Sequence, residues 1–108
     1  MSDLYFELQE KQDELDKAIK DLREAGRKYA EADTTYRRTV AKEALRLKAK
    51  GMAVGLIEKA VFDDEQVLDA LFQRDYTDTL VTASKEMINA LKLRIKTISE
   101  QLAREYGR

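Results

Sequence analysis

The chain has 108 residues, of which 44% are hydrophobic and 38% are charged, and its formal net charge at pH 7 is −1. It contains no histidine, no cysteine and no proline. Without cysteine there is no disulfide, thiolate nucleophile or sulfur-ligated metal, and without histidine the commonest general base is missing. We therefore expect one domain that is not an enzyme, with no catalytic residue, no cofactor and no metal.

The N-terminal residues, MSDLYFELQEK, are acidic and contain no apolar core of signal-peptide length. No apolar run elsewhere approaches the length of a membrane span. The sequence therefore predicts a cytoplasmic protein that has no membrane partner.

The first predicted element is a helix over residues 3–50. Ser2 or Asp3 is expected to cap its N-terminus, and Gly51 is expected to end it. Gly26 is costly inside a helix, and we expect close packing against a bulky side chain to explain it. Apolar residues recur every seven positions, at Leu8, Leu15, Leu22, Tyr29 and Tyr36. Such a repeat is typical of helices that wind around each other.

An elbow with a short helix is predicted over residues 51–64, GMAVGLIEKAVFDD. Asp63 or Asp64 is then expected to cap the next helix. The elbow is rich in apolar side chains, namely Met52, Val54, Leu56, Ile57, Val61 and Phe62. These residues either form a small local core or bind a second copy or a partner protein.

The last predicted element is a helix over residues 65–106, which Gly107 is expected to end. Its apolar positions again recur at heptad spacing, at Val81, Ile88, Leu91, Ile95, Ile98 and Leu102. Apolar residues along both long helices are expected to face one another, which leaves few of them free.

Charge indicates how the two long helices pair. Residues 1–16 and 63–78 are acidic, whereas residues 37–50 and 92–108 are basic. Folding the chain back at the elbow sets acid against base at both ends, whereas a parallel pair would set acid against acid. The predicted fold class is therefore all-α, an antiparallel two-helix coiled-coil hairpin with a short kinked helix at the turn. We expect it to dimerise into a helical bundle.

The run ALRLKAKGMAVGLIEKAVFDDEQV resembles the helix-turn-helix motif of resolvase-type DNA-binding proteins. The helix that would enter the major groove begins with Asp63, Asp64 and Glu65, followed by Asp69. Carboxylates at this position would repel phosphates, so we favour a hairpin elbow of similar shape over a DNA reader.

Two charged patterns have alternative interpretations. A row of cations at four-residue spacing, Arg38, Lys42, Arg46 and Lys50, would bind nucleic acid or an acidic protein, or would form a solvated face paired to Asp69, Asp75 and Asp78. Glu7 with Glu10, and Asp75 with Asp78, have the spacing that holds magnesium in all-helical nucleotide pyrophosphatases. We interpret these carboxylates as solvated surface.

Several segments resemble small uncharacterised helical proteins encoded by phages and prophages of Gram-positive bacteria. The segments are Tyr36-Arg37, residues 46–57, Ile88-Asn89, Leu91-Lys92-Leu93 and Glu105-Tyr106. The resemblance implies an accessory protein of the early-region type, located in the bacterial host cytosol, and implies no assigned chemistry.

The functional hypothesis is a non-enzymatic protein that acts by binding an unidentified host or phage protein. The partner would be a host defence or replication factor, which the chain would inhibit. The predicted binding residues are Met52, Val54, Leu56 and Phe62, supported by Arg38, Lys42, Arg46 and Lys50. The alternative is a nucleic-acid-binding accessory of phage replication or recombination. We expect a homo-oligomer and no small-molecule substrate.

Overall fold

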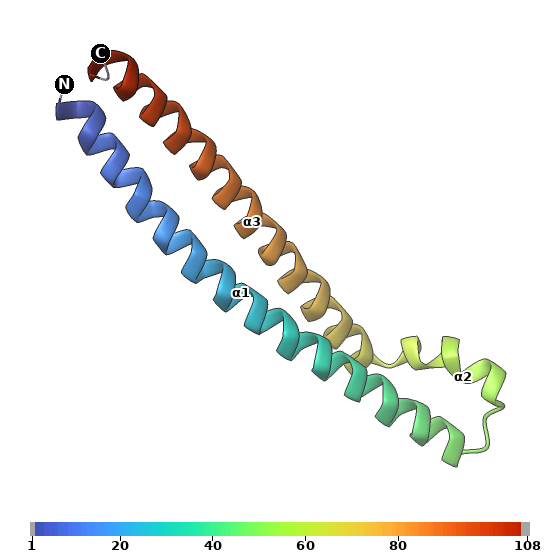
Figure 1. The fold of residues 1–108 in the computed structure, drawn as a ribbon. Coiled ribbons are helices and arrows are strands. Elements are labelled where there is room, and N and C mark those ends of the chain that lie inside the picture. The colour runs from blue at the N-terminus through green and yellow to red at the C-terminus, as the bar shows by residue number, and fades with distance from the viewer. Residues whose placement is uncertain (1, 107–108) are drawn as a thin grey trace. The chain divides into compact units, whose positions relative to one another are not determined.

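A computed structural model describes residues 2–106, and all of its regular elements are helices (Figure 1). The elements are helix α1 (Ser2–Ala49), helix α2 (Val54–Ala60), the 3₁₀ helix η1 (Val61–Asp63) and helix α3 (Glu65–Tyr106). The chain is a helical hairpin in which α1 and α3 pack against each other. The predicted all-α hairpin is therefore confirmed. Gly107, the expected stop of the last helix, lies outside the described residues.

The described residues divide into two compact units. The terminal unit joins α1 up to Ala25 to α3 from Val81 onward, and the turn unit comprises residues 26–80.

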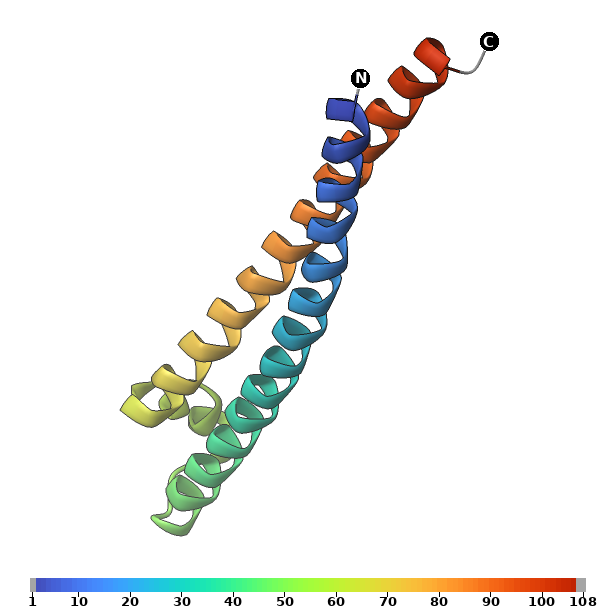
Figure 2. The same ribbon diagram turned by 90° about the vertical axis from the view of Figure 1, so that its left-hand side faces the viewer.

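In the terminal unit, α1 and α3 run antiparallel. Ala18 of α1 packs with Ile88 and Leu91 of α3, and the half-buried side chains of Leu15, Ile19 and Leu22 surround this cluster. Near the ends of the helices, Arg94 forms an ion pair with Glu7, and the rings of Tyr5 and Tyr106 lie 6.1 Å apart. Figures 1 and 2 show the start of α1 beside the end of α3. The heptad positions therefore face one another here, and an acid–base pair joins the two helices.

In the turn unit, Gly51 ends α1 as expected. Its φ angle is 89°, a left-handed conformation that an L side chain disfavours. The Gly51 N–H donates to the Lys48 carbonyl at 3.0 Å, and the Met52 N–H donates to the Leu47 carbonyl at 3.1 Å. These are the two hydrogen bonds of a Schellman motif, and they satisfy carbonyls that the helix end leaves open.

Asp64 rather than Asp63 caps α3. Its backbone is extended, with φ −80° and ψ 129°, and its Oδ2 accepts a hydrogen bond from the Val67 N–H at 3.0 Å. At the other long helix, α1 already includes Ser2, so the expected cap at Ser2 or Asp3 does not stand before the helix. Asp3 lies in the first turn instead, where its carboxylate interacts favourably with the positive end of the helix dipole.

Candidate interaction surface of the turn unit

The apolar side chains of the segment that connects α1 to α3 divide into a buried and an exposed set. Ile57 and Val61 are buried against Leu47 of α1, and Val40, Ala44, Met52 and Ala60 pack around them. Because Ile57 and Val61 are four residues apart, they lie on one helical face. The neighbouring side chains of Val54, Leu56 and Phe62 are 72%, 63% and 40% exposed. A local core and an exposed apolar surface are therefore both present.

The four predicted apolar binding residues, Met52, Val54, Leu56 and Phe62, are called the turn patch below. Met52 is half-buried because it packs on the small core, and the other three are exposed. In the turn patch, therefore, Met52 contributes to the small core, whereas Val54, Leu56 and Phe62 remain in contact with solvent.

The predicted basic row, Arg38, Lys42, Arg46 and Lys50, lies on α1 and just beyond its end, and all four residues are exposed. Arg46 forms an ion pair with Glu43 of its own helix, and its Nη2 donates to Glu43 Oε2 at 2.9 Å. This hydrogen bond lowers the pKa of the Glu43 carboxyl, against the opposing effect of burial. The same contact raises the pKa of Arg46.

Among residues 2–106, the basic row forms no ion pair with Asp69, Asp75 or Asp78, so the interpretation of this row as a face paired to those carboxylates is not supported. Asp75 Oδ1 instead accepts hydrogen bonds from Arg74, its neighbour in sequence, and Arg46 is held by Glu43. Ion pairs between residues of one helix form more readily than pairs between two helices, because no second helix has to position the partner. Among residues 2–106, Arg38, Lys42 and Lys50 form no ion pair.

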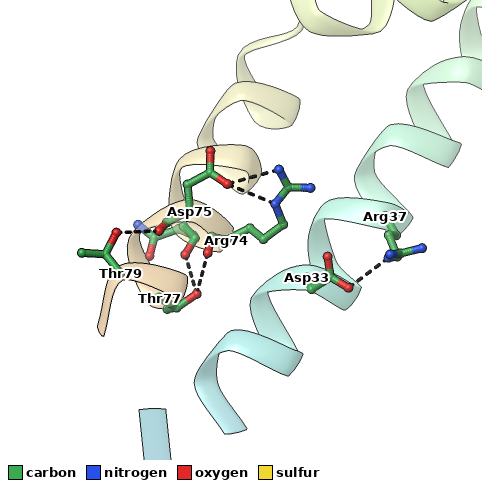
Figure 3. A network of polar contacts seen from close by, with 7 residues as sticks. Asp33, Arg37, Arg74, Asp75, Thr77 and Thr79 are labelled. Carbon is green, nitrogen blue, oxygen red and sulfur yellow. Dashed lines mark hydrogen bonds and ion pairs between the residues drawn. The ribbon is translucent and has the colours of Figure 1, made fainter. Parts of the chain in front are cut away.

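Arg74 contacts the other long helix through an aromatic ring. Its guanidinium carbon lies 4.4 Å from the centroid of Tyr36. Its Nε and Nη2 atoms donate to Asp75 Oδ1 at 3.2 and 3.1 Å, which raises the pKa of Arg74. Figure 3 shows Arg74 extended toward α1, with Asp33 and Arg37 paired on that helix. This contact could not be seen from the sequence, where residues 63–78 stand out only as an acidic block.

The expectation that apolar residues of the long helices face one another is wrong for part of α3. Leu68, Phe72 and Tyr76 are 46%, 63% and 51% exposed. The rings of Phe72 and Tyr76 stack with their planes 1° apart and their centroids 6.1 Å apart. We call these three residues the aromatic strip. Their four-residue spacing places them on one face, a signal that the search for heptads overlooked.

A groove of about 540 Å³ runs between α1 and α3 within the turn unit. Small side chains line much of it, including Ala32, Thr35, Thr39, Ala70 and Thr77. The buried Thr77 hydroxyl lies 2.8 and 2.9 Å from the carbonyl oxygens of Gln73 and Arg74 (Figure 3). The helix backbone thus satisfies this hydroxyl.

The predicted carboxylate pairs are partly engaged by arginines. Glu7 is paired with Arg94, and Asp75 with Arg74. Among residues 2–106, no three carboxylates come together in an arrangement that would hold a metal ion. The same part of the chain contains no helix with the length and apolar character needed to cross a membrane.

The fold and this surface define a helical hairpin with exposed apolar and basic side chains on its turn unit. Comparisons with protein-family models, curated proteins and solved structures found no match to the chain.

Proposed function

We propose that this chain is a non-enzymatic protein that acts by binding another protein through the turn patch. The observation that carries the proposal is the exposure of Val54, Leu56 and Phe62. The small core next to them is formed by Ile57 and Val61 with Leu47 and does not need these three side chains. Exposed apolar side chains with charged residues nearby are typical of binding sites. Burying one such side chain in a complex contributes roughly 1.5–3 kcal/mol.

The three unpaired cations of the basic row support an acidic partner surface. Arg38, Lys42 and Lys50 are exposed and have no ion-pair partner among the described residues, so docking would not break an existing pair. Charges at the rim of an interface mainly speed association and select the partner, while the apolar centre supplies affinity. We propose this division of roles for the turn patch and for the cations that precede it in the chain.

The finer proposal is an accessory protein of a phage or prophage of Gram-positive bacteria. It rests on the resemblance of Tyr36-Arg37 and of residues 46–57 to such proteins. The chain would act in the host cytoplasm by covering a surface of a host defence or replication factor, and so inhibit it. The kinked helix at the turn and a dimeric bundle belong to this same proposal.

The test is capture of partners from a lysate of a Gram-positive host, followed by mass spectrometry. The wild-type chain is compared with a Leu56→Asp, Phe62→Asp double variant and with a control, Leu93→Asp. Leu93 is 66% exposed and lies in the terminal unit, so the control adds charge at a similar site elsewhere. We expect wild type and control to capture the same protein and the double variant to lose it. Capture that survives in a folded double variant would contradict the assignment.

Nucleic-acid binding is the second candidate, and the unpaired Arg38, Lys42 and Lys50 favour it. Against it, α3 begins at Glu65 beside the capping carboxylate of Asp64, so the helix that would read DNA starts with acidic residues. Phosphates would be repelled there. Protein binding therefore remains the first proposal.

A further inference from the structure

The turn unit carries two exposed helical faces of opposite charge. The basic face lies on α1 and consists of Arg38, Lys42 and Leu45. The spacing of these residues, four and then three, places them on one side of the helix. Leu45 is 67% exposed, and the two cations have no ion-pair partner among residues 2–106. The basic face thus has an apolar centre with free positive charge beside it.

The acidic face lies on α3 and consists of the aromatic strip together with Glu65 and Asp69. Both carboxylate residues are exposed, and neither has an ion-pair partner in the described part of the chain. The exposed rings of Phe72 and Tyr76 lie with their planes parallel. Such rings attract cations over their faces and lose little conformational entropy when they are covered.

We propose that the basic face of one copy of this chain docks on the acidic face of another. The two faces are complementary in charge, and each also exposes apolar side chains, Leu45 on the basic face and the aromatic strip on the acidic face. Lys42 and Arg38 would lie over Phe72 and Tyr76 and near Asp69. Other proteins with a basic amphipathic helix would fit as well, but a second copy is the occupant for which the matching surface is seen.

The proposed contact is head-to-tail, because it joins two different faces. A head-to-tail contact leaves one unused face at each end of the assembly, so it allows growth beyond a dimer unless a ring closes. A contact of a few residues on each side is small, and small interfaces are weak and transient. We therefore expect self-association that rises with protein concentration.

This inference rests on the proposed function and deepens it by assigning a self-association surface, which includes Arg38 and Lys42 of the basic row but no residue of the turn patch. The two can fail independently. Loss of partner capture in the Leu56→Asp, Phe62→Asp variant concerns the turn patch, whereas the oligomeric state of variants at Leu45 and Phe72 concerns the docking faces.

The experiment is sedimentation velocity and equilibrium on the purified full chain over a wide concentration range. Leu45→Asp disables the basic face and Phe72→Asp disables the acidic face. Leu93→Asp is the matched control, since all three positions are between 63% and 67% exposed. Circular dichroism checks that each variant keeps its helices. We expect concentration-dependent assembly for wild type and control, and monomers for each of the two face variants alone.

Mixing the two face variants separates the proposal from other kinds of association. Leu45→Asp retains the acidic face and Phe72→Asp retains the basic face, so an equimolar mixture should form 1:1 dimers and nothing larger. A mixture that stays monomeric would overturn the proposal. So would wild-type protein that is monomeric throughout, or self-association that survives in either variant, because a dimer built from one face alone would ignore the other substitution.

Discussion

The guanidinium carbon of Arg74 lies 4.4 Å from the centre of the Tyr36 ring, which links α3 to α1 within the turn unit. Arg74 also donates two hydrogen bonds to Asp75, so its head group is held in place while its charge faces the ring. The contact explains how the Arg74 cation is accommodated between α3 and α1, where it faces the Tyr36 ring of α1. A cation over an aromatic face is attracted by the ring quadrupole.

We expect Arg74→Met to destabilise the protein, because methionine keeps an unbranched stem but loses the charge. The coupling with Tyr36→Leu should be roughly 0.5–2 kcal/mol. A double-mutant cycle measured by urea unfolding isolates this coupling from the loss of ring burial. If the two substitutions are simply additive, the cation–ring contact does not stabilise the fold.

The heptad positions of the terminal unit should carry much of its stability. Ile88 is buried against Ala18, so Ile88→Ala should destabilise by about 2–4 kcal/mol. Leu22 is only half-buried, and Leu22→Ala should cost less. Glu10 is exposed, and Glu10→Ala should stay within about 0.5 kcal/mol. Thermal or urea unfolding ranks the three variants, and equal effects would show that the heptads do not mark the core.

The Gly51 stop and a cap at Asp63 or Asp64 could be predicted because each rests on a local rule. The hairpin could be predicted because heptads and charge blocks recur along both long helices. Heptad spacing marks which residues of a helix are buried, and a left-handed helix end calls for glycine. Phe72 and Tyr76 could not be placed in this way. Their exposure depends on where α1 lies around α3, which spacing on α3 alone does not define.

The candidate site was predictable only in outline. Apolar density at residues 52–62 identified the surface, but which side chains are buried depends on the contact of α2 and η1 with Leu47. Glu43 illustrates the same limit. It lies inside a basic stretch, where it is buried and holds Arg46, so the charge count of residues 37–50 concealed an ion pair within one helix.

Two glycines should respond to alanine in opposite directions. Gly51 has φ 89°, so Gly51→Ala should destabilise by roughly 1–2 kcal/mol. Gly26 lies inside α1, and beyond the neighbouring backbone of its own helix a Cβ there would meet no atom of the described residues within 4 Å, so the expected close packing is not found. Gly26→Ala should therefore stabilise by about 1 kcal/mol, the difference in helix propensity. Urea unfolding of both variants checks the signs, and a destabilising Gly26→Ala would reveal a packing partner.

The ion pair between Glu43 and Arg46 should make the free energy of unfolding depend on pH in the acidic range. Because the pKa of Glu43 is lower in the folded protein, its stabilisation is present at neutral pH. It is lost as the pH falls below the ordinary glutamate value of about 4.3 and through the folded pKa. The free energy of unfolding of wild type should exceed that of Glu43→Gln at pH 7, and the difference should shrink in acid. In an Arg46→Met background this pH dependence should largely disappear, which ties it to the pair.

Duplex DNA should bind weakly and without sequence preference. The net charge is −1, and α3 begins with acidic residues, so we expect the exposed cations of α1, among them Arg38 and Lys42, to supply the phosphate contacts. Fluorescence anisotropy at physiological salt should give dissociation constants of about 10⁻⁶ to 10⁻⁴ M, as for non-specific binders. Arg38→Glu with Lys42→Glu should remove this binding, whereas Lys20→Glu with Lys92→Glu, the same change in charge elsewhere, should preserve more of it. Nanomolar binding to one sequence, abolished only by the first pair, would make nucleic acid the first candidate partner in place of a protein.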